Sequence, residues 1–187
     1  FAIHLISTIR KKTSSKTSNC RLSTLRLNKQ LCLTTRIPKR MSKFELHPDL
    51  QRDGVHLGNF QLCRVLLIND SNYPWFVLIP EIPDTSDTID LSLTEHEQLW
   101  KESRTFSLAI MELFNGDKLN VAALGNVTPQ LHIHHIVRYQ SDPAWPAPIW
   151  GKRPLTPYLE SALKEIHNLF AAAELDNFSL EVELSSS

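Results

Sequence analysis

The chain has 187 residues, about the length of one domain, and 42% of them are hydrophobic, which is enough for one sizeable core and excludes a peptide or a coat protein. Its 20 basic residues balance 20 acidic residues, so the formal net charge of zero favours neither a nucleic acid nor an acidic partner. The charge is unevenly distributed. Residues 1–44 contain eleven basic residues and no acidic residue, so residues 45–187 carry nine basic and twenty acidic residues, a net charge of −11.

The basic segment at residues 1–44 is interpreted as a disordered leader that precedes a folded domain at residues 45–175. It is rich in Ser, Thr, Lys and Arg and has no sustained apolar period. Met41 precedes an abrupt change to ordinary domain composition, which favours upstream sequence read in frame over a mitochondrial transit peptide. A nucleic-acid-binding arm is the third interpretation, because the segment has no interleaved aromatic residues to stack on bases.

Cysteine usage and hydropathy bear on the location of the protein. Of three cysteines only Cys63 lies beyond the leader, which excludes a disulfide framework or a cysteine-based zinc site in the domain and indicates a reducing compartment. No run approaches the roughly 18–20 apolar residues that span a bilayer, so no membrane partner is expected. We therefore expect a cytoplasmic protein, or a mitochondrial one if the leader is a transit peptide.

The first predicted elements are two strands and a long helix. Short apolar runs at residues 61–69 and 75–80, separated by turn-forming residues, predict adjacent strands. Ser92 and Glu95 have the spacing of a capping box, and apolar residues follow at helical spacing until Gly116. This pattern predicts one long amphipathic helix.

Two more strands and a last helix follow. Residues 118–124 and 130–138 predict a third and a fourth strand. Thr156, with Pro157 at the first helical position, predicts the beginning of a C-terminal helix. The order of strands, helix, strands and helix is that of an α+β fold. The tail at residues 176–187 is expected to be frayed.

Only the segment at residues 130–138, QLHIHHIVR, is dense enough in reactive side chains to carry chemistry. Side chains alternate along a strand, so Gln130, His132 and His134 share one face and His135 lies on the other. Residues i and i+2 are about 6.6–6.8 Å apart, which lets two imidazoles flank one phosphate group. One neutral imidazole can attack phosphorus while its cationic neighbour delivers a proton, and no metal or cofactor is then required.

This segment resembles the signature of the histidine triad (HIT) family, H-x-H-x-H followed by two apolar residues. The flanking segments that agree are Leu67-Ile68-Asn69, Val77-Leu78-Ile79-Pro80, Asp90-Leu91, Asp142-Pro143-Ala144-Trp145-Pro146 and Ile149-Trp150-Gly151. The last two look like a bacterial subgroup often called diadenosine-tetraphosphate-hydrolase-like. The resemblance implies an antiparallel sheet with one long helix packed on it, a C-terminal helix, and a homodimer formed through strand edges and the long helix.

The resemblance implies roles for individual residues. His132 matches the middle histidine of the triad, which is the nucleophile, and His134 matches the last histidine, which lies beside the scissile phosphate. Gln130 stands at the first triad position, where it can form hydrogen bonds but cannot titrate. His135 stands where the family has an apolar residue, so it is expected to take no part in the chemistry.

The resemblance also implies a nucleotide substrate. Asn69 matches the residue that contacts the ribose, and Gly125 and Asn126 resemble the phosphate loop. The implied activity is hydrolysis or transfer at a phosphoanhydride or phosphoramidate of a purine nucleotide, through a nucleotidyl-histidine intermediate. The alternatives are a nucleotide-binding module of the same fold without turnover, and a metal-dependent hydrolase in which the imidazoles hold zinc.

Overall fold

The computed structural model describes residues 42–182; residues 1–41 of the leader and residues 183–187 of the tail lie outside this part. The described elements are, in chain order, α2 (Pro48–Asp53), β1 (Gly54–Asn59), β2 (Cys63–Ile68), β3 (Trp75–Pro80), η1 (Thr88–Asp90), α3 (Leu93–Phe114), β4 (Lys118–Ala123), β5 (Ile133–Arg138), α4 (Glu160–Ala173) and β6 (Ser179–Leu180). Within residues 42–182, no helix combines the length and the hydrophobicity needed to cross a bilayer.

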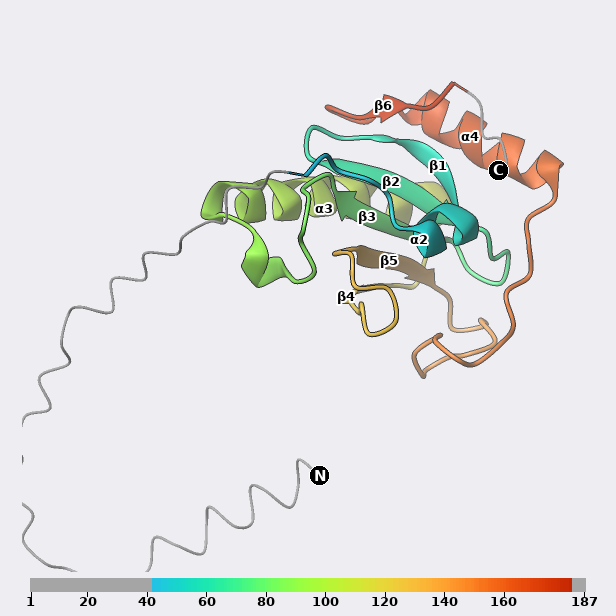
Figure 1. Cartoon of the computed structure of the whole chain (residues 1–187). Helices are drawn as coiled ribbons and strands as arrows, with labels where there is room; N and C mark the ends of the chain where they lie inside the picture. Colours follow the sequence, from blue (N-terminus) through green and yellow to red (C-terminus); the bar gives the residue numbers. More distant parts are fainter. Residues whose placement is uncertain (1–41, 183–187) are drawn as a thin grey trace, which may run out of the picture. The chain divides into compact units, whose positions relative to one another are not determined.

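The six strands form one antiparallel sheet in the order β4-β5-β3-β2-β1-β6 (Figure 1). The predicted α+β fold, with one long helix and a C-terminal helix, is confirmed. Predicted strands at residues 75–80 and 118–124 match β3 and β4 closely, but the strand predicted from residue 130 begins only at Ile133. Between β3 and β5, Phe76 pairs with His135 and Val77 pairs with His134, which fixes the face on which each histidine lies.

Helix α3 begins as the sequence predicts. The Ser92 hydroxyl accepts a hydrogen bond from the Glu95 N–H at 3.3 Å, and the Glu95 carboxylate accepts one from the Ser92 N–H at 2.8 Å. The helix ends at Phe114, and Asn115 caps it in the left-handed conformation with φ of 47°. Gly116 follows because a Cβ atom there would collide with Val137 of β5.

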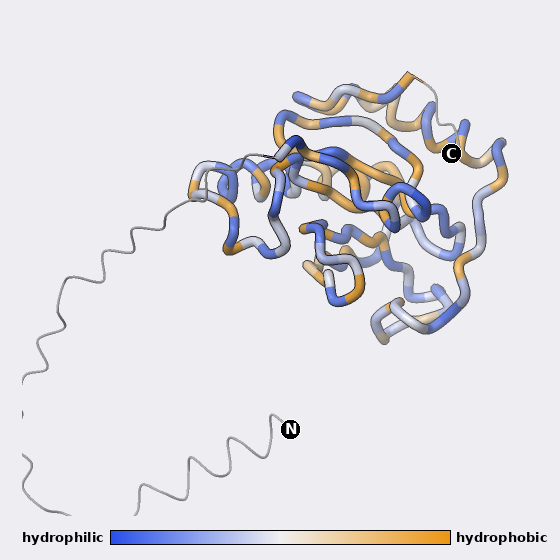
Figure 2. Tube along the Cα trace, viewed as in Figure 1, coloured by the Kyte–Doolittle hydropathy of each residue, from blue (hydrophilic) through white to orange (hydrophobic). Residues whose placement is uncertain are grey.

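The sheet buries apolar side chains on both faces. One face packs against α3 and α4 in a large core; its members include Leu57, Val65, Leu67, Phe76, Leu78, Ile133 and Val137 from the strands, Leu99, Phe106 and Ile110 from α3, and Leu163, Ile166 and Phe170 from α4. The other face carries a smaller cluster in which Leu66, Ile68, Val77 and Ile79 pack against Leu50 of α2. Hydrophobic residues follow the strands, and hydrophilic residues follow the peripheral turns (Figure 2). The second face is the less covered one.

The prediction that the last helix begins at Thr156 is wrong, because α4 begins at Glu160 with Leu159 as its N-cap. The segment before α4 is held instead by the turn after β2. The Thr156 N–H donates to the Asp70 carboxylate at 3.1 Å, and the Tyr158 N–H donates to the Asn69 side-chain oxygen at 2.8 Å. These backbone N–H groups precede the helix and are bound by a turn that is distant in the sequence, which the local sequence does not reveal.

The two ends of the domain also differ from the prediction. The expected frayed tail is wrong for Ser179 and Leu180, which pair with Asn59 and Gly58 of β1. Phe44, which the composition assigns to the leader, packs against the cluster on the second face of the sheet. Neither α2 nor β1 is predicted, because α2 has only six residues and β1 contains two glycines, which are depleted in strands.

A buried ion pair holds the long connection between β5 and α4. The Arg138 guanidinium donates to Asp142 at 2.6 Å and 3.0 Å, to the Asn120 side chain of β4 at 2.7 Å and to the Ala147 carbonyl at 3.0 Å. The side chains of Arg138 and Asp142 are 2% and 3% exposed. Although burial opposes it, the guanidinium lowers the pKa of Asp142 below its usual range. This pair therefore anchors the loop that carries Trp150 over the second face.

We expect Asp142→Ala to lower the free energy of unfolding by about 3–5 kcal/mol, because it leaves the Arg138 charge buried without its partner. Urea denaturation at pH 7 measures this change. Lys164→Met is the matched control, since it removes an ion pair of the same i,i+4 spacing whose side chains are exposed, and it should change stability little. Equal effects of the two variants on the free energy of unfolding would contradict the stabilising role of the buried Arg138–Asp142 pair.

Candidate active site

Strand alternation separates the histidines of β5 between the two faces of the sheet. His135 points into the core, where its Nε2 accepts a hydrogen bond from the Ser103 hydroxyl of α3 at 2.8 Å and its ring packs against Phe106. His134 lies on the opposite face, where its ring centroid is 4.7 Å from that of His132. The sequence predicts this division, and the core contacts of His135 explain why a histidine is tolerated where an apolar residue is expected.

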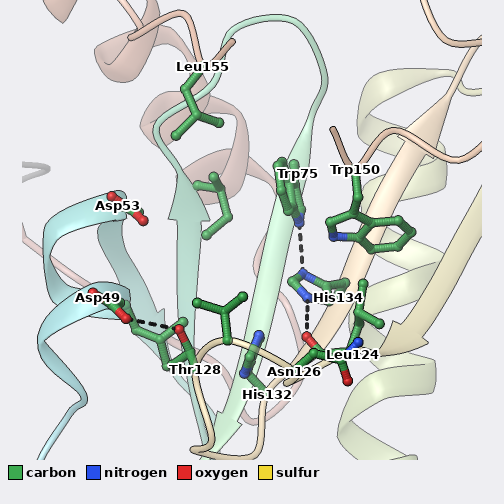
Figure 3. A pocket seen from close by; sticks show the side chains of 13 residues that line it. Asp49, Asp53, Trp75, Leu124, Asn126, Thr128, His132, His134, Trp150 and Leu155 are labelled. Carbon is green, nitrogen blue, oxygen red and sulfur yellow. Dashed lines mark hydrogen bonds between the residues drawn. The ribbon is translucent and has the colours of Figure 1, made fainter. Parts of the chain in front are cut away.

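His132 and His134 together line a cavity of about 350 Å³ on the second face (Figure 3). Its other walls come from α2, from the loop after β4 and from the loop before α4. The remaining lining residues are Asp49, Leu50, Asp53, Ile68, Trp75, Leu124, Asn126, Val127, Thr128, Trp150 and Leu155. The two carboxylates lie on the α2 side of the cavity, apart from the histidines. The cavity therefore has two imidazoles on one side and two carboxylate hydrogen-bond acceptors on the other.

The hydrogen bonds of His132 define its protonation state. Its Nδ1 lies 2.7 Å from the carbonyl oxygen of Gln130. Because a carbonyl only accepts, Nδ1 carries the proton and Nε2 keeps a lone pair. Burial lowers the pKa of His132, although the bond to the carbonyl opposes this effect. His132 is therefore a neutral imidazole with one unprotonated nitrogen.

His134 has the opposite tautomer. The indole N–H of Trp75 lies 3.0 Å from its Nδ1, and the Leu124 carbonyl lies 3.4 Å from its Nε2. An indole N–H only donates, so Nδ1 accepts and Nε2 carries the proton. Burial, reinforced by the neighbouring His132, lowers the pKa of His134 to about 4. His134 is therefore a neutral imidazole in the free protein.

Two of the predicted site residues lie outside this cavity. Gln130 accepts a hydrogen bond from the His47 N–H at 3.0 Å and donates to the Glu45 carbonyl at 2.9 Å, so its amide holds the segment before α2. Asn69 accepts from Tyr158, as described above, and does not line the cavity. Both side chains are engaged by backbone groups that lie far away in the sequence.

Gly125 and Asn126 lie beside His132 in the loop after β4. They line a second cavity of about 330 Å³, and His132 and Asn126 border both cavities. A Cβ atom on Gly125 would lie 3.0 Å from the Thr128 carbonyl and 3.9 Å from the His132 ring, so a side chain there would crowd the loop. The structure thus brings this loop, but not the side chains of Asn69 or Gln130, to the histidine pair.

Sequence reasoning missed four polar or aromatic residues of the cavity, namely Asp49, Asp53, Trp75 and Thr128. Trp75 stands two positions before Val77, the partner of His134, so strand alternation could have placed it on the same face. Asp49 and Asp53 are both bound by Arg52, which lies between them on α2. The hydrogen bond from Arg52 lowers the pKa of Asp49, which keeps this carboxylate charged. The sequence of so short a helix gave no signal for these acids.

Trp150, from the Trp-Pro loop that the sequence singles out, also lines the cavity. Its ring centroid lies 5.3 Å from that of His134. In residues 42–182, no group of three or more His, Cys, Asp or Glu side chains is arranged to hold a metal ion.

Comparison with known proteins identifies the fold. A model of the HIT domain matches residues 50–141, which include both histidines of the cavity. A histidine triad protein from Marinobacter aquaeolei is 46% identical, and the match covers 71% of this chain and 96% of that one with a TM-score of 0.69. The chain belongs to the histidine triad family.

Two further histidine triad proteins support this membership. One from Bradyrhizobium japonicum is 38% identical with a TM-score of 0.69, over 71% of this chain and 98% of that one. One from Sinorhizobium meliloti is 32% identical with a TM-score of 0.68, over 70% of this chain and 96% of that one. No curated protein matches this HIT protein significantly.

We expect the HIT domain to lose stability as the pH falls from about 6.5 to about 4. Burial lowers the pKa of His134 and of His135 to about 4, so the unfolded chain binds protons more tightly than the folded one in this interval. Above pH 6.5 both histidines are neutral in the folded and the unfolded chain, and the free energy of unfolding is at its full value. By pH 4, protonation of each histidine in the unfolded chain should lower this free energy by roughly 3 kcal/mol. Urea denaturation at several pH values measures the slope. His134→Gln should make it shallower, and an unchanged slope would contradict the assignment.

Proposed function

We propose that this HIT protein is a nucleotide hydrolase or transferase that cleaves a phosphoanhydride or phosphoramidate of a purine nucleotide through a nucleotidyl intermediate on His132. The observation that carries the proposal is the tautomer of His132, whose protonated Nδ1 faces the Gln130 carbonyl and leaves Nε2 as a neutral nucleophile beside a cavity. The lowered pKa keeps this nitrogen unprotonated at neutral pH.

The hydrogen bond to Gln130 also suits the intermediate. When the Nε2 lone pair forms a bond to phosphorus, the bond from phosphorus to the leaving group breaks and the imidazole ring becomes cationic. The proton on Nδ1 then carries more positive charge, and the carbonyl oxygen at 2.7 Å stabilises it. Water later attacks phosphorus and releases a proton to the solvent, while the electron pair of the broken P–N bond returns to Nε2 and restores the neutral ring. The main chain of Gln130 thus supports catalysis although its side chain lies elsewhere.

The rest of the cavity supports a nucleoside. Leu50, Ile68 and Leu155 form an apolar wall for a base, and Asp49 and Asp53 present acceptors for its N–H groups or for ribose hydroxyls. The loop at Gly125 and Asn126 is the candidate for phosphate contacts, whereas Asn69, the ribose contact that the resemblance implies, does not line this cavity. The Trp-Pro loop favours the diadenosine-tetraphosphate-hydrolase-like subgroup, and the single cysteine of the domain favours a cytoplasmic location.

The alternative is a nucleotide-binding module without turnover. It is favoured by Gln130, whose amide is occupied by the backbone of residues 45–47 and offers no titrating group to the reaction. Single-turnover labelling separates the two functions, because only the enzyme forms a covalent adduct. A chelator would inhibit a metal-dependent hydrolase, but it would affect neither the proposed enzyme nor the nucleotide-binding module.

We expect His132→Ala to abolish labelling by α-phosphate-labelled adenosine 5′-phosphoramidate or diadenosine tetraphosphate, and to lower turnover by roughly 10³-fold or more. His134→Ala should slow turnover by about 10- to 100-fold, because the leaving group loses a hydrogen-bond donor. His135→Ala is the matched control on the other face, and its folded fraction should label normally.

Binding of AMP is measured in parallel by thermal shift, and saturating AMP should raise the melting temperature of all three variants. Absence of any shift in the unaltered protein would sink the nucleotide assignment. Loss of the label in His135→Ala, with retention in His132→Ala, would show that the nucleophile is misassigned.

We further propose a homodimer that forms through the edge of the sheet at β4. This strand is at one end of the strand order, so its outer backbone groups have no partner strand among the described residues. Val121 of β4 is 40% exposed and Leu108 of α3 is 57% exposed, and α3 contacts β4. Unpaired backbone next to exposed apolar side chains suits pairing with a second copy.

We expect the protein to sediment as a dimer and Val121→Glu to sediment as a monomer, because the substitution places paired negative charges across a twofold-related edge. Analytical ultracentrifugation measures both masses. Ile89→Glu is the matched control, since Ile89 is exposed on η1 and should leave the mass unchanged. A monomeric unaltered protein would refute the dimer.

A further inference from the structure

Two tryptophans enclose His134, but only one of them forms a hydrogen bond with it. The Trp75 and Trp150 ring centroids lie 5.5 Å and 5.3 Å from the imidazole centroid (Figure 3). Trp75 donates its indole N–H to Nδ1 at 3.0 Å, whereas the buried indole nitrogen of Trp150 has no hydrogen-bond partner. Trp75 and Trp150 meet edge to face at 6.3 Å. The same imidazole therefore has one aromatic contact that fixes its protonation and one that does not.

The bond from Trp75 favours one state of His134 over the two others. In the cationic ring and in the other neutral tautomer, Nδ1 carries a proton, which would face the indole N–H as a second donor. Trp75 cannot take up that proton, because an indole nitrogen does not accept. The Leu124 carbonyl on the other side of the ring accepts from Nε2 and favours the same tautomer. Both neighbours thus hold the proton on Nε2.

The charged and titratable groups around His134 do not reverse this preference. His132 lies beside it on the same face, and a charge on His132 or on His135 disfavours a charge on His134. The carboxylates that line the same cavity are those of Asp49 and Asp53, on the α2 side. Arg52 binds both of them, which offsets their negative charge.

We propose that Trp75 is a positioning residue that holds His134 neutral with its proton on Nε2, and that the site thereby selects substrates whose leaving group departs without full protonation. The proposal rests on the nucleotide chemistry proposed above. In the attack, the His132 lone pair forms the N–P bond and the electron pair of the broken P–O bond goes to the leaving oxygen. His134 donates a hydrogen bond to that oxygen and keeps its proton.

This arrangement distinguishes two classes of leaving group. A phosphate, a carboxylate or a nitrophenolate is stable as an anion and needs only the hydrogen bond from Nε2. An amine must gain a proton as the P–N bond breaks, and a neutral imidazole that gave up its only proton would become an imidazolate, which is far too basic to form at neutral pH. Phosphoanhydrides and related activated esters should therefore react faster than phosphoramidates.

The experiment compares Trp75→Phe with Trp150→Phe by NMR of the ligand-free protein labelled with ¹⁵N-histidine. In the unaltered protein, Nδ1 of His134 should be unprotonated at pH 7. Trp75→Phe keeps an aromatic ring but removes the donor, so the Nδ1-protonated forms should appear and the pH midpoint of His134 should rise. Trp150→Phe is the matched control, because it trims the other indole and removes an N–H that makes no hydrogen bond. The tautomer of His134 should stay unchanged in Trp150→Phe.

The second readout is the ratio of turnover of AMP p-nitrophenyl ester to that of adenosine 5′-phosphoramidate at pH 6. We expect Trp75→Phe to lower this ratio about tenfold or more, because a cationic His134 can protonate the amine. Trp100→Phe should leave the ratio unchanged, since Trp100 makes a similar 3.0 Å bond to His96 on α3, outside the cavity.

The outcomes separate this inference from the proposed function. A proton on Nδ1 of His134 in the unaltered protein, or equal tautomer changes in Trp75→Phe and Trp150→Phe, would overturn the role of Trp75. The unaltered protein alone provides the first of these tests if the variants do not fold. Absence of turnover with both probes, together with the expected tautomers, would refute the nucleotide chemistry and the selection of leaving groups while the positioning role stands.

Discussion

The antiparallel pairing of β3 with β5 determines where the reactive groups of this protein lie. With Val77 opposite His134 and Phe76 opposite His135, one histidine enters the cavity and its neighbour enters the core beneath α3. A shift of the register by one residue would exchange them and bury the reactive ring against Phe106. The pairing is secured by apolar side chains on both faces of the sheet, so core packing and active-site geometry depend on the same contacts.

The two histidines of the cavity are neutral in the free protein. Both histidines of the cavity have lowered pKa values because they are buried, and no Lys or Arg lines either of the two cavities in the described part of the chain. Selectivity between nitrogens comes from hydrogen bonds with fixed direction, namely those to the Gln130 carbonyl and from the Trp75 indole. Such a site attracts a phosphate less strongly than a cationic one, but its proposed nucleophile, His132, is unprotonated at Nε2 at neutral pH.

The sequence predicts the parts of this protein that depend on local patterns. The capping box at Ser92 and the alternation around His134 act over a few residues, and both predictions match the structure. The start of the last helix, the place of Gln130 and the role of Trp75 depend on contacts between residues 59 to 86 positions apart, which no local pattern encodes. The family resemblance supplied His132 as the proposed nucleophile, but it could not show that the side chain of Gln130 turns away from the cavity.

Arg138 joins parts of the fold that the proposed function treats separately. Its guanidinium binds Asn120 on the edge strand β4 and the Ala147 carbonyl in the loop that carries Trp150 to His134. The proposed assembly edge at β4 and the loop that borders the cavity therefore share one set of hydrogen bonds. Thermodynamic linkage makes any coupling between the two events reciprocal: a nucleotide that tightens the loop would strengthen subunit association by the same factor by which association strengthens nucleotide binding.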